Sequence, residues 1–157
     1  MIPNKKISIV VPNYKNSKYL ERTLNSLIEQ THKNIEIIVV CDKPEEDCDK
    51  LVKSYMEKDK RIIYIKNDER QGKFKARIQG AQKATGEYIA FLDADNYASI
   101  DFYRNALNNA QANNSDIVIG NIVYEKENGE KNIYNLMQLP LKSIEGKECF
   151  KKFFEQN

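Results

Sequence analysis

The chain has 157 residues, of which 41% are hydrophobic and 31% are charged, and its formal net charge at pH 7 is +2. This length suits one domain with a core of its own, and the interspersed acids and bases exclude the basic stripe of a dedicated nucleic-acid surface. No run approaches the ~18 apolar residues that a membrane span needs, so no transmembrane helix is predicted.

Strands and helices alternate over the first two thirds of the sequence. The segment 7–11 (ISIVV) is an unbroken β-branched run, typical of a strand buried on both faces of a parallel sheet, and Pro12 is expected to end it. Apolar residues then recur at helical spacing over residues 17–30. The alternation continues through strands at 35–40, 62–65 and 88–92 and helices around 48–56, 74–81 and 102–110. Four such units predict an α/β fold, with an open, mostly parallel sheet, right-handed crossovers and helices on both faces.

The pattern changes in the last quarter of the chain. Residues 117–124 read as a long strand, the Asn128-Gly129 pair predicts a hairpin turn, and residues 131–137 would form the returning strand. A last helix, with an apolar face, is expected to run to the end of the chain without a glycine or proline terminator. Its apolar residues are Cys149, Phe150, Phe153 and Phe154. We therefore expect the chain to stop inside a larger protein.

The cysteines and the single histidine limit the chemistry. Three cysteines without a paired spacing fit neither a disulfide framework nor a zinc site, and they predict reduced thiols in a cytoplasmic protein. The polar residues 1–6 carry no secretory signal. His32 lies in a polar turn, where we expect it to be solvated, and no nucleophile is near it in sequence. Ser-His-Asp and Cys-His mechanisms are therefore discarded.

Acidic side chains follow the second and fourth predicted strands, where ligands of an open α/β sheet bind. Asp93 and Asp95 stand two residues apart behind a wholly apolar strand. Since positions i and i+2 of extended backbone point the same way, the two carboxylates can converge on one Mg²⁺ or Mn²⁺, whose open positions substrate phosphates fill. An isolated Asp-x-Asp is more often a pair of turn-forming acids. The position at the ligand edge favours the metal site.

Other side chains at this edge allow two interpretations each. Asp42 either caps the following helix or accepts a hydrogen bond from a base N–H or a ribose hydroxyl. Tyr14 either packs on the surface or stacks on a base. Lys73 and Arg77, one helical turn apart, either form a solvated face or meet a diphosphate.

Two segments, ISIVVPNYKNSKYLERTLNSLIEQTHKNIEIIVVCD and ATGEYIAFLDADN, carry a family resemblance. Over residues 5–125 the chain resembles family 2 of the glycosyltransferases. The resemblance implies a GT-A (Rossmann-like) fold and inverting transfer from a nucleotide-diphosphate sugar, with UDP favoured, to a saccharide or lipid-linked acceptor. It also implies a Mn²⁺ or Mg²⁺ cofactor and cell-surface polysaccharide or glycoconjugate assembly at the cytoplasmic face. We expect at most peripheral membrane contact and no nucleic-acid partner.

The resemblance also assigns roles by position. Pro12 and Tyr14 match residues that line the base pocket, and Asp42 matches the acid that contacts uracil. Asp93 matches the acid near the ribose and the metal, and Asp95 matches the ligand of the metal that bridges the diphosphate.

A basic element and two departures complete the match. Gly72 and Lys73 resemble the glycine-basic element before the third helix. The family usually has two acids and Gly-Ser after strand two, whereas residues 41–44 here are Cys-Asp-Lys-Pro, and Asn96 stands where a further aspartate is common.

The catalytic base of the family is an Asp or Glu beyond the metal motif, and no acid of the tail matches a motif. The tail acids are Asp116, Glu125, Glu127, Glu130, Glu145 and Glu148. The base therefore lies beyond residue 157, or the chain is a non-catalytic nucleotide-sugar-binding module of the same fold. We expect residues 1–157 to form a single GT-A nucleotide-sugar-binding domain, with 5–125 as its core and 126–157 as the start of the acceptor-side region.

Rival α/β enzymes lack their motifs. A dinucleotide dehydrogenase needs Gly-x-Gly-x-x-Gly after the first strand, where this chain has Pro-Asn-Tyr-Lys-Asn. No phosphate-binding loop of a nucleoside triphosphatase occurs, and the acidic pair of a phosphoacceptor signalling domain is missing after the first strand.

Overall fold

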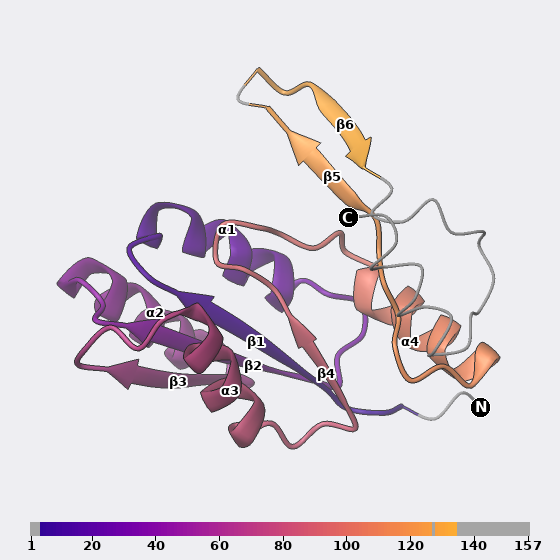
Figure 1. Cartoon of the computed structure of the whole chain (residues 1–157), viewed down its shortest axis with the longest axis horizontal. Helices are drawn as coiled ribbons and strands as arrows, with labels where there is room; N and C mark the ends of the chain where they lie inside the picture. Colours follow the sequence, from indigo (N-terminus) through magenta and orange to yellow (C-terminus); the bar gives the residue numbers. More distant parts are fainter. Residues whose placement is uncertain (1–3, 127, 135–157) are drawn as a thin grey trace. The chain divides into compact units, whose positions relative to one another are not determined.

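The computed structural model describes residues 4–126 and 128–134, in two compact units. The first unit, Met1–Asn105, contains a four-stranded parallel sheet in the order β3-β2-β1-β4 (Figure 1). The second unit, Ala106–Asn157, contains a two-stranded antiparallel sheet, β5-β6.

The strands and helices of the α/β part follow the predicted order. The strands are β1 (Ile7–Asn13), β2 (Ile35–Asp42), β3 (Ile62–Asn67) and β4 (Tyr88–Phe91), and the helices are α1 (Ser17–Ile28), α2 (Glu46–Lys58), α3 (Lys73–Lys83) and α4 (Phe102–Asn113). The predicted parallel α/β architecture is confirmed. One boundary was wrong: β1 does not end at Pro12, which pairs in register with Val40. Proline is tolerated there because the pairing of β1 with β4 ends at Val10 and Phe91, so its missing N–H group is not needed on that side.

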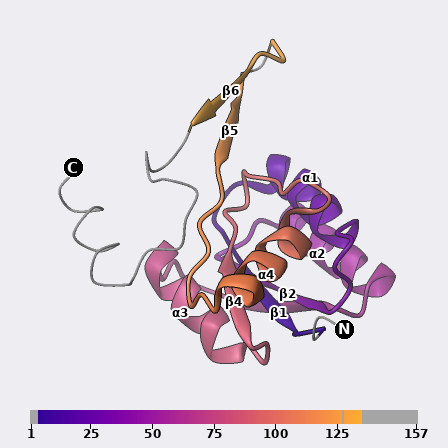
Figure 2. The same ribbon diagram turned by 90° about the vertical axis from the view of Figure 1, so that its right-hand side faces the viewer.

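Helices cover both faces of the sheet. Helix α3 lies on one face, and α1 and α2 lie on the other (Figures 1 and 2). Every residue of β1 and β2 is buried, as the unbroken apolar runs predict. Val10, Ile38 and Val40 form a core cluster with Ala76 of α3. The core thus fixes α3 against the two central strands.

Helix α3 approaches β1 closely at Gly80. A Cβ atom built on Gly80 would lie 2.2 Å from Cγ1 of Val10, whose side chain is fully buried. Because valine is stiff and surrounded by core, neither side can yield cheaply. The absence of a side chain at this position therefore sets the distance between α3 and the sheet.

We predict that Gly80→Ala destabilises the protein. Alanine in a helix interior normally stabilises relative to glycine, but the clash with Val10 should outweigh this and lower the free energy of unfolding by about 1–3 kcal/mol. Urea unfolding followed by circular dichroism measures the change. Gln82→Ala, at an exposed position of the same helix, is the matched control and should have little effect. A stabilised Gly80→Ala variant would contradict the close packing.

A buried carboxylate ties three strands together at the amino end of the sheet. Glu36 is 5% exposed; its Oε2 lies 2.6 Å from Lys6 Nζ, and its Oε1 accepts hydrogen bonds from Ser8 Oγ (2.5 Å) and Thr85 N (2.6 Å). Burial alone would raise the pKa of Glu36, but these donors outweigh it and lower the pKa from 4.5 to about 2. The ionised form therefore stabilises the fold.

This pKa shift predicts acid sensitivity. Because the folded pKa of Glu36 lies below its ordinary value, its contribution is complete above pH 4.5 and is lost as the pH falls toward 2. Glu36→Gln should lower the free energy of unfolding by about 1–3 kcal/mol at neutral pH and flatten its pH dependence between these values. Urea titrations at several pH values measure both effects, and equal slopes in the two proteins would contradict the assignment.

The second unit contains the predicted hairpin, with one correction. Strand β5 (Ile122–Glu125) pairs with β6 (Lys131–Tyr134), and Gly129 has a φ of 84°, so the Asn-Gly turn is confirmed. The predicted strand at 117–124 was wrong over 117–121, where the structure has no strand. The pairing with β6 starts at Ile122, so 117–121 have no partner in it. Residues 135–137 and the predicted last helix lie outside the described residues.

The structure corrects the expectation that His32 is solvated and shows two of the cysteines as free thiols. His32 is 8% exposed rather than solvated, because its Nε2 lies 2.9 Å from the carbonyl oxygen of Lys5. Cys41 and Cys48 are free and buried, with 3.9 Å between their sulfur atoms. In the part of the chain that the structure describes, no helix has both the length and the hydrophobicity to cross a membrane.

Candidate functional site

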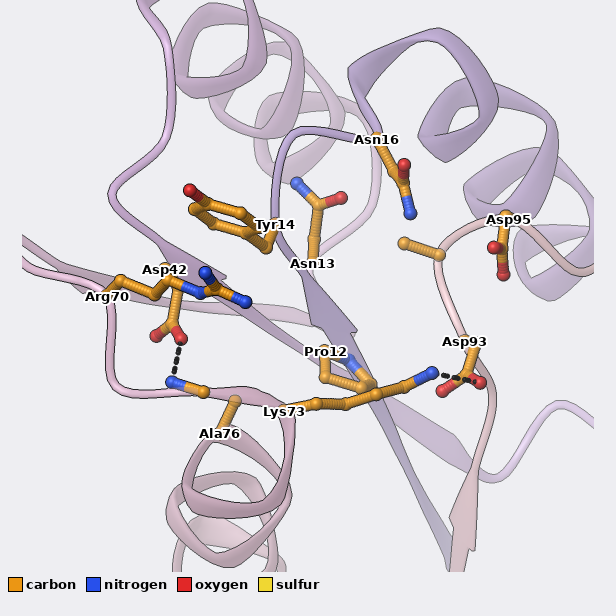
Figure 3. Close-up of a pocket in the computed structure, with 12 residues that line it drawn as sticks. Pro12, Asn13, Tyr14, Asn16, Asp42, Arg70, Lys73, Ala76, Asp93 and Asp95 are labelled. Atoms are coloured by element: carbon orange, nitrogen blue, oxygen red, sulfur yellow. Dashed lines mark hydrogen bonds and ion pairs between the residues drawn. The ribbon is translucent and has the colours of Figure 1, made fainter.

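A pocket lies at the carboxyl ends of β1, β2 and β4 and the amino end of α3. Its lining residues are Pro12, Asn13, Tyr14, Asn16, Asp42, Arg70, Gly72, Lys73, Ala76, Asp93, Ala94 and Asp95. Figure 3 shows Tyr14, Asp42 and Arg70 on one side, the two acids after β4 on the other, and Lys73 reaching across between them. The structure therefore brings all six sequence-predicted site residues to one pocket, as the strand-end rule requires.

The two acids after β4 differ in their surroundings. Asp93 is half-buried, and both of its oxygens are occupied: Oδ2 lies 2.5 Å from Lys73 Nζ and Oδ1 lies 2.8 Å from Arg77 Nη2. Asp95 is exposed and has no hydrogen bond or ion pair within the residues that the structure describes. Lys73 and Arg77 therefore both pair with Asp93, although the side chain of Lys73 is also 55% exposed.

Helix α1 holds the loop that carries these acids. Thr23 is fully buried in α1, and its hydroxyl lies 2.9 Å from the carbonyl oxygen of Ala94 and 2.7 Å from that of Asn96. Gln30, also fully buried, donates to the carbonyl oxygen of Ser99 at 2.7 Å. The loop after β4 is therefore held by side chains of α1 and of the segment that follows it, together with its own turn, in which Asn96 N donates to the carbonyl oxygen of Asp93 at 2.9 Å.

Asp42 is a buried anchor. It is 2% exposed; Oδ2 accepts from the backbone N–H groups of Gln71 (3.0 Å) and Gly72 (2.7 Å), and Oδ1 accepts from Asn67 Nδ2 (2.7 Å). The residue before α2 is Glu45, so Asp42 does not cap that helix. Instead, its carboxylate fixes the backbone from which α3 begins.

The ring of Tyr14 makes cation–π contacts with two basic side chains. The guanidinium carbon of Arg70 lies 4.5 Å from the ring centroid, and Lys15 Nζ lies 5.6 Å from it. Arg70 covers the ring from inside the pocket (Figure 3). A base that stacks on this face of Tyr14 must therefore displace or share the guanidinium.

The turn after β2 has a backbone conformation typical of glycine, although no glycine is present there. Lys43 stands where the resemblance has glycine, and its φ is 44°, in the left-handed region that favours glycine. Its backbone N–H donates to the carbonyl oxygen of Asn67 at 2.8 Å. The departure in sequence therefore costs some strain but leaves Asp42 in the pocket wall.

Comparison with known proteins agrees with this geometry. A family model described as glycosyl transferase family 2 matches residues 8–155. The chain belongs to this family. Glycosyltransferase GlyA of Streptococcus pneumoniae is 36% identical over 121 residues, which are 77% of this chain and 17% of that protein. An uncharacterised glycosyltransferase of Methanocaldococcus jannaschii is 32% identical over 154 residues, 96% of this chain and 52% of that protein.

A solved structure confirms the GT-A fold of this family 2 chain. S. aureus TarS 1–349 in complex with UDP matches it with a TM-score of 0.65 and 28% identity, over 71% of this chain and 33% of that one. The chain thus spans about half or less of the length of the relatives it matches.

The residues of this family 2 pocket suit one hard cation. Among residues 4–126 and 128–134, no group of three or more His, Cys, Asp or Glu side chains is placed to hold a metal. Mg²⁺ is usually held by one or two carboxylates together with substrate phosphates and waters, so a pair is sufficient. Asp95 offers free oxygens, and Asp93 offers its own only after Lys73 and Arg77 release them.

The sequence interpretation missed the residues that position the site. Arg77 was not assigned to Asp93, and Thr23, Gln30 and Asn67 were not singled out. Two signals were present: Thr23 and Gln30 are polar on the apolar side of a helical period, and Asn67 ends the third strand. A polar residue at a core position needs a buried partner, which points to such anchors.

We predict that Asp42→Asn loosens the start of α3. The asparagine NH₂ group would replace one acceptor oxygen, so at least one of Gln71 N–H, Gly72 N–H or the Asn67 amide loses its partner, at a cost of about 1–3 kcal/mol. Hydrogen exchange should become faster at the amides of Gln71 and Gly72. Asp47→Asn, at an exposed position of α2, is the control. Unchanged protection of both amides would contradict the anchor role.

Proposed function

We propose that the protein containing this chain is an inverting glycosyltransferase that uses a UDP-sugar and a divalent cation. The observation that carries the proposal is that Asp93 and Asp95 line the same pocket as Tyr14 and Asp42. Membership of the family supports it, and so does TarS, which is 28% identical and forms complexes with UDP and with UDP-GlcNAc.

The pocket has a separate group for each part of a nucleotide diphosphate. The ring of Tyr14 offers a stacking surface for the base, and Asp42 lies beside it with a lone pair of Oδ1 still available to a base N–H. Lys73, with a side chain that is 55% exposed, can reach the diphosphate between the base and the acids. The cavity volume is about 200 Å³. This is smaller than the ~300–1,000 Å³ typical of ligand sites, so the pocket suits only part of a nucleotide sugar.

Asp95, joined by Asp93, would hold the divalent cation. When bound, Mn²⁺ or Mg²⁺ supplies Lewis-acid stabilisation of the negative charge that grows on the leaving diphosphate oxygen. Lys73 and Arg77 add positive charge on the same side. The chain's own contribution is therefore to place fixed charges where the leaving group develops its own.

The proposed reaction is a single in-line displacement. The acceptor hydroxyl oxygen forms a bond to the anomeric carbon while the bond from that carbon to the diphosphate oxygen breaks, and UDP leaves. The acceptor is a saccharide or glycoconjugate, and its proton passes to a carboxylate base that we place beyond residue 157. One displacement inverts the anomeric configuration.

Asp95→Asn tests the assignment. Calorimetry on the 157-residue chain should detect UDP binding in Mn²⁺, and the variant should weaken it at least about tenfold, because it loses a charged ligand of the cation. Asp47→Asn, which removes an exposed acid of α2 that does not line the pocket, should bind UDP as the parent chain does.

Two results would change the proposal. Equal UDP affinity for the parent chain and Asp95→Asn would remove the metal assignment. Binding of UDP by the intact protein without slow release of UDP from any UDP-sugar would favour the non-catalytic module instead.

A further inference from the structure

Both carboxylate oxygens of Asp93 are ion-paired. Lys73 Nζ lies 2.5 Å from Oδ2, and Arg77 Nη2 lies 2.8 Å from Oδ1. Asp95, two residues on, is exposed and has no partner among the described residues. One acid of the pair is therefore open to a cation, and the other is locked in an ion-pair triad.

The local charges oppose the entry of a cation by itself. Two positive groups contact Asp93, and together they balance the charges of Asp93 and Asp95; on the opposite wall Arg70 and Asp42 carry opposite charges, so the lining has no net negative charge to attract a cation. A dication at the two acids would lie next to Lys73 and Arg77, and each of these contacts is repulsive. A diphosphate reverses this balance, because it attracts the dication and both basic side chains.

We propose that Lys73 and Arg77 form a lock on Asp93 that makes divalent-cation binding conditional on the diphosphate. This inference rests on the proposed function. The phosphate oxygens replace Asp93 as the partner of Lys73, and Asp93 becomes free to join Asp95 on the cation. Lys73 is the group that exchanges, since its side chain is 55% exposed, while Arg77, which is 37% exposed, keeps Asp93 oriented.

The position of Lys73 explains how one residue can serve both states. It is the first residue of α3, directly after Gly72, whose N–H is fixed by the buried carboxylate of Asp42. Its backbone is therefore held at the pocket while its long side chain is free to turn. The exchange needs a rotation of one side chain and no movement of the helix.

The lock predicts a reciprocal coupling between the two ligands. If UDP raises the affinity for Mn²⁺ by some factor, then Mn²⁺ raises the affinity for UDP by the same factor. Removing the charge of Lys73 should change the two separate affinities in opposite directions: Mn²⁺ alone binds more tightly, and UDP in Mn²⁺ binds more weakly. A residue that only contacts phosphate would not improve binding of the cation alone.

The experiment uses Lys73→Gln, which removes the charge and keeps a hydrogen-bonding side chain that is one bond shorter. Electron paramagnetic resonance of free Mn²⁺ measures cation binding without nucleotide, and calorimetry measures UDP binding with Mn²⁺. We expect at least about a tenfold gain for Mn²⁺ alone, since a positive charge next to the dication is lost, and about a tenfold loss for UDP. Lys75→Gln, two residues further along α3 and outside the pocket, is the matched control and should change neither affinity.

A double variant tests whether Lys73→Gln changes Mn²⁺ binding through Asp93. In Lys73→Gln/Asp93→Asn the gain in Mn²⁺ affinity should disappear, because the released carboxylate is no longer present. Unchanged or weaker Mn²⁺ binding by folded Lys73→Gln would overturn the lock, even where UDP binding by the parent chain upholds the proposed function. Failure of the parent chain to bind UDP would overturn the proposed function, while the Mn²⁺ measurement still decides the lock.

Discussion

The buried carboxylate of Asp42 is the interaction on which the site depends. It joins the end of β2 to the backbone at Gln71 and Gly72, and so fixes the point at which α3 begins. From that point, Lys73 and Arg77 reach across the pocket to Asp93. A group 2% exposed and paired with backbone donors is worth more to a fold than any exposed ion pair. The basic wall of the pocket is therefore positioned by a buried acid at the end of β2.

The acidic wall is held by a different helix. Thr23 of α1 and Gln30, just after that helix, contact the carbonyl groups of the loop after β4, across a separation in sequence of about seventy residues. The loop itself has no regular secondary structure between Phe91 and Phe102. Its shape is thus a consequence of tertiary packing on α1. The two walls share one frame, because β4 pairs with β1 and α3 packs on β1, and the ion pairs of Asp93 join them across the pocket.

The sequence predicted the elements and the place of the site better than the contacts within it. Unbroken apolar runs identified the strands, because burial on both faces leaves little room for polar residues, and the strand-end rule then located Tyr14, Asp42, Asp93 and Asp95. The partners of these residues come from other elements, and no local pattern specifies them. Solvation of His32 was wrong for the same reason, since its burial is decided by a carbonyl oxygen 27 residues away.

The arrangement also explains why two acids can sit together in a pocket without a strong repulsion. Both oxygens of Asp93 pair with Lys73 and Arg77, while Asp95 is exposed. The charges that line the pocket are therefore close to balanced. The ligand that we propose, a diphosphate with its dication, would bring both signs of charge to these groups at once, which a lone cation or a lone base would not.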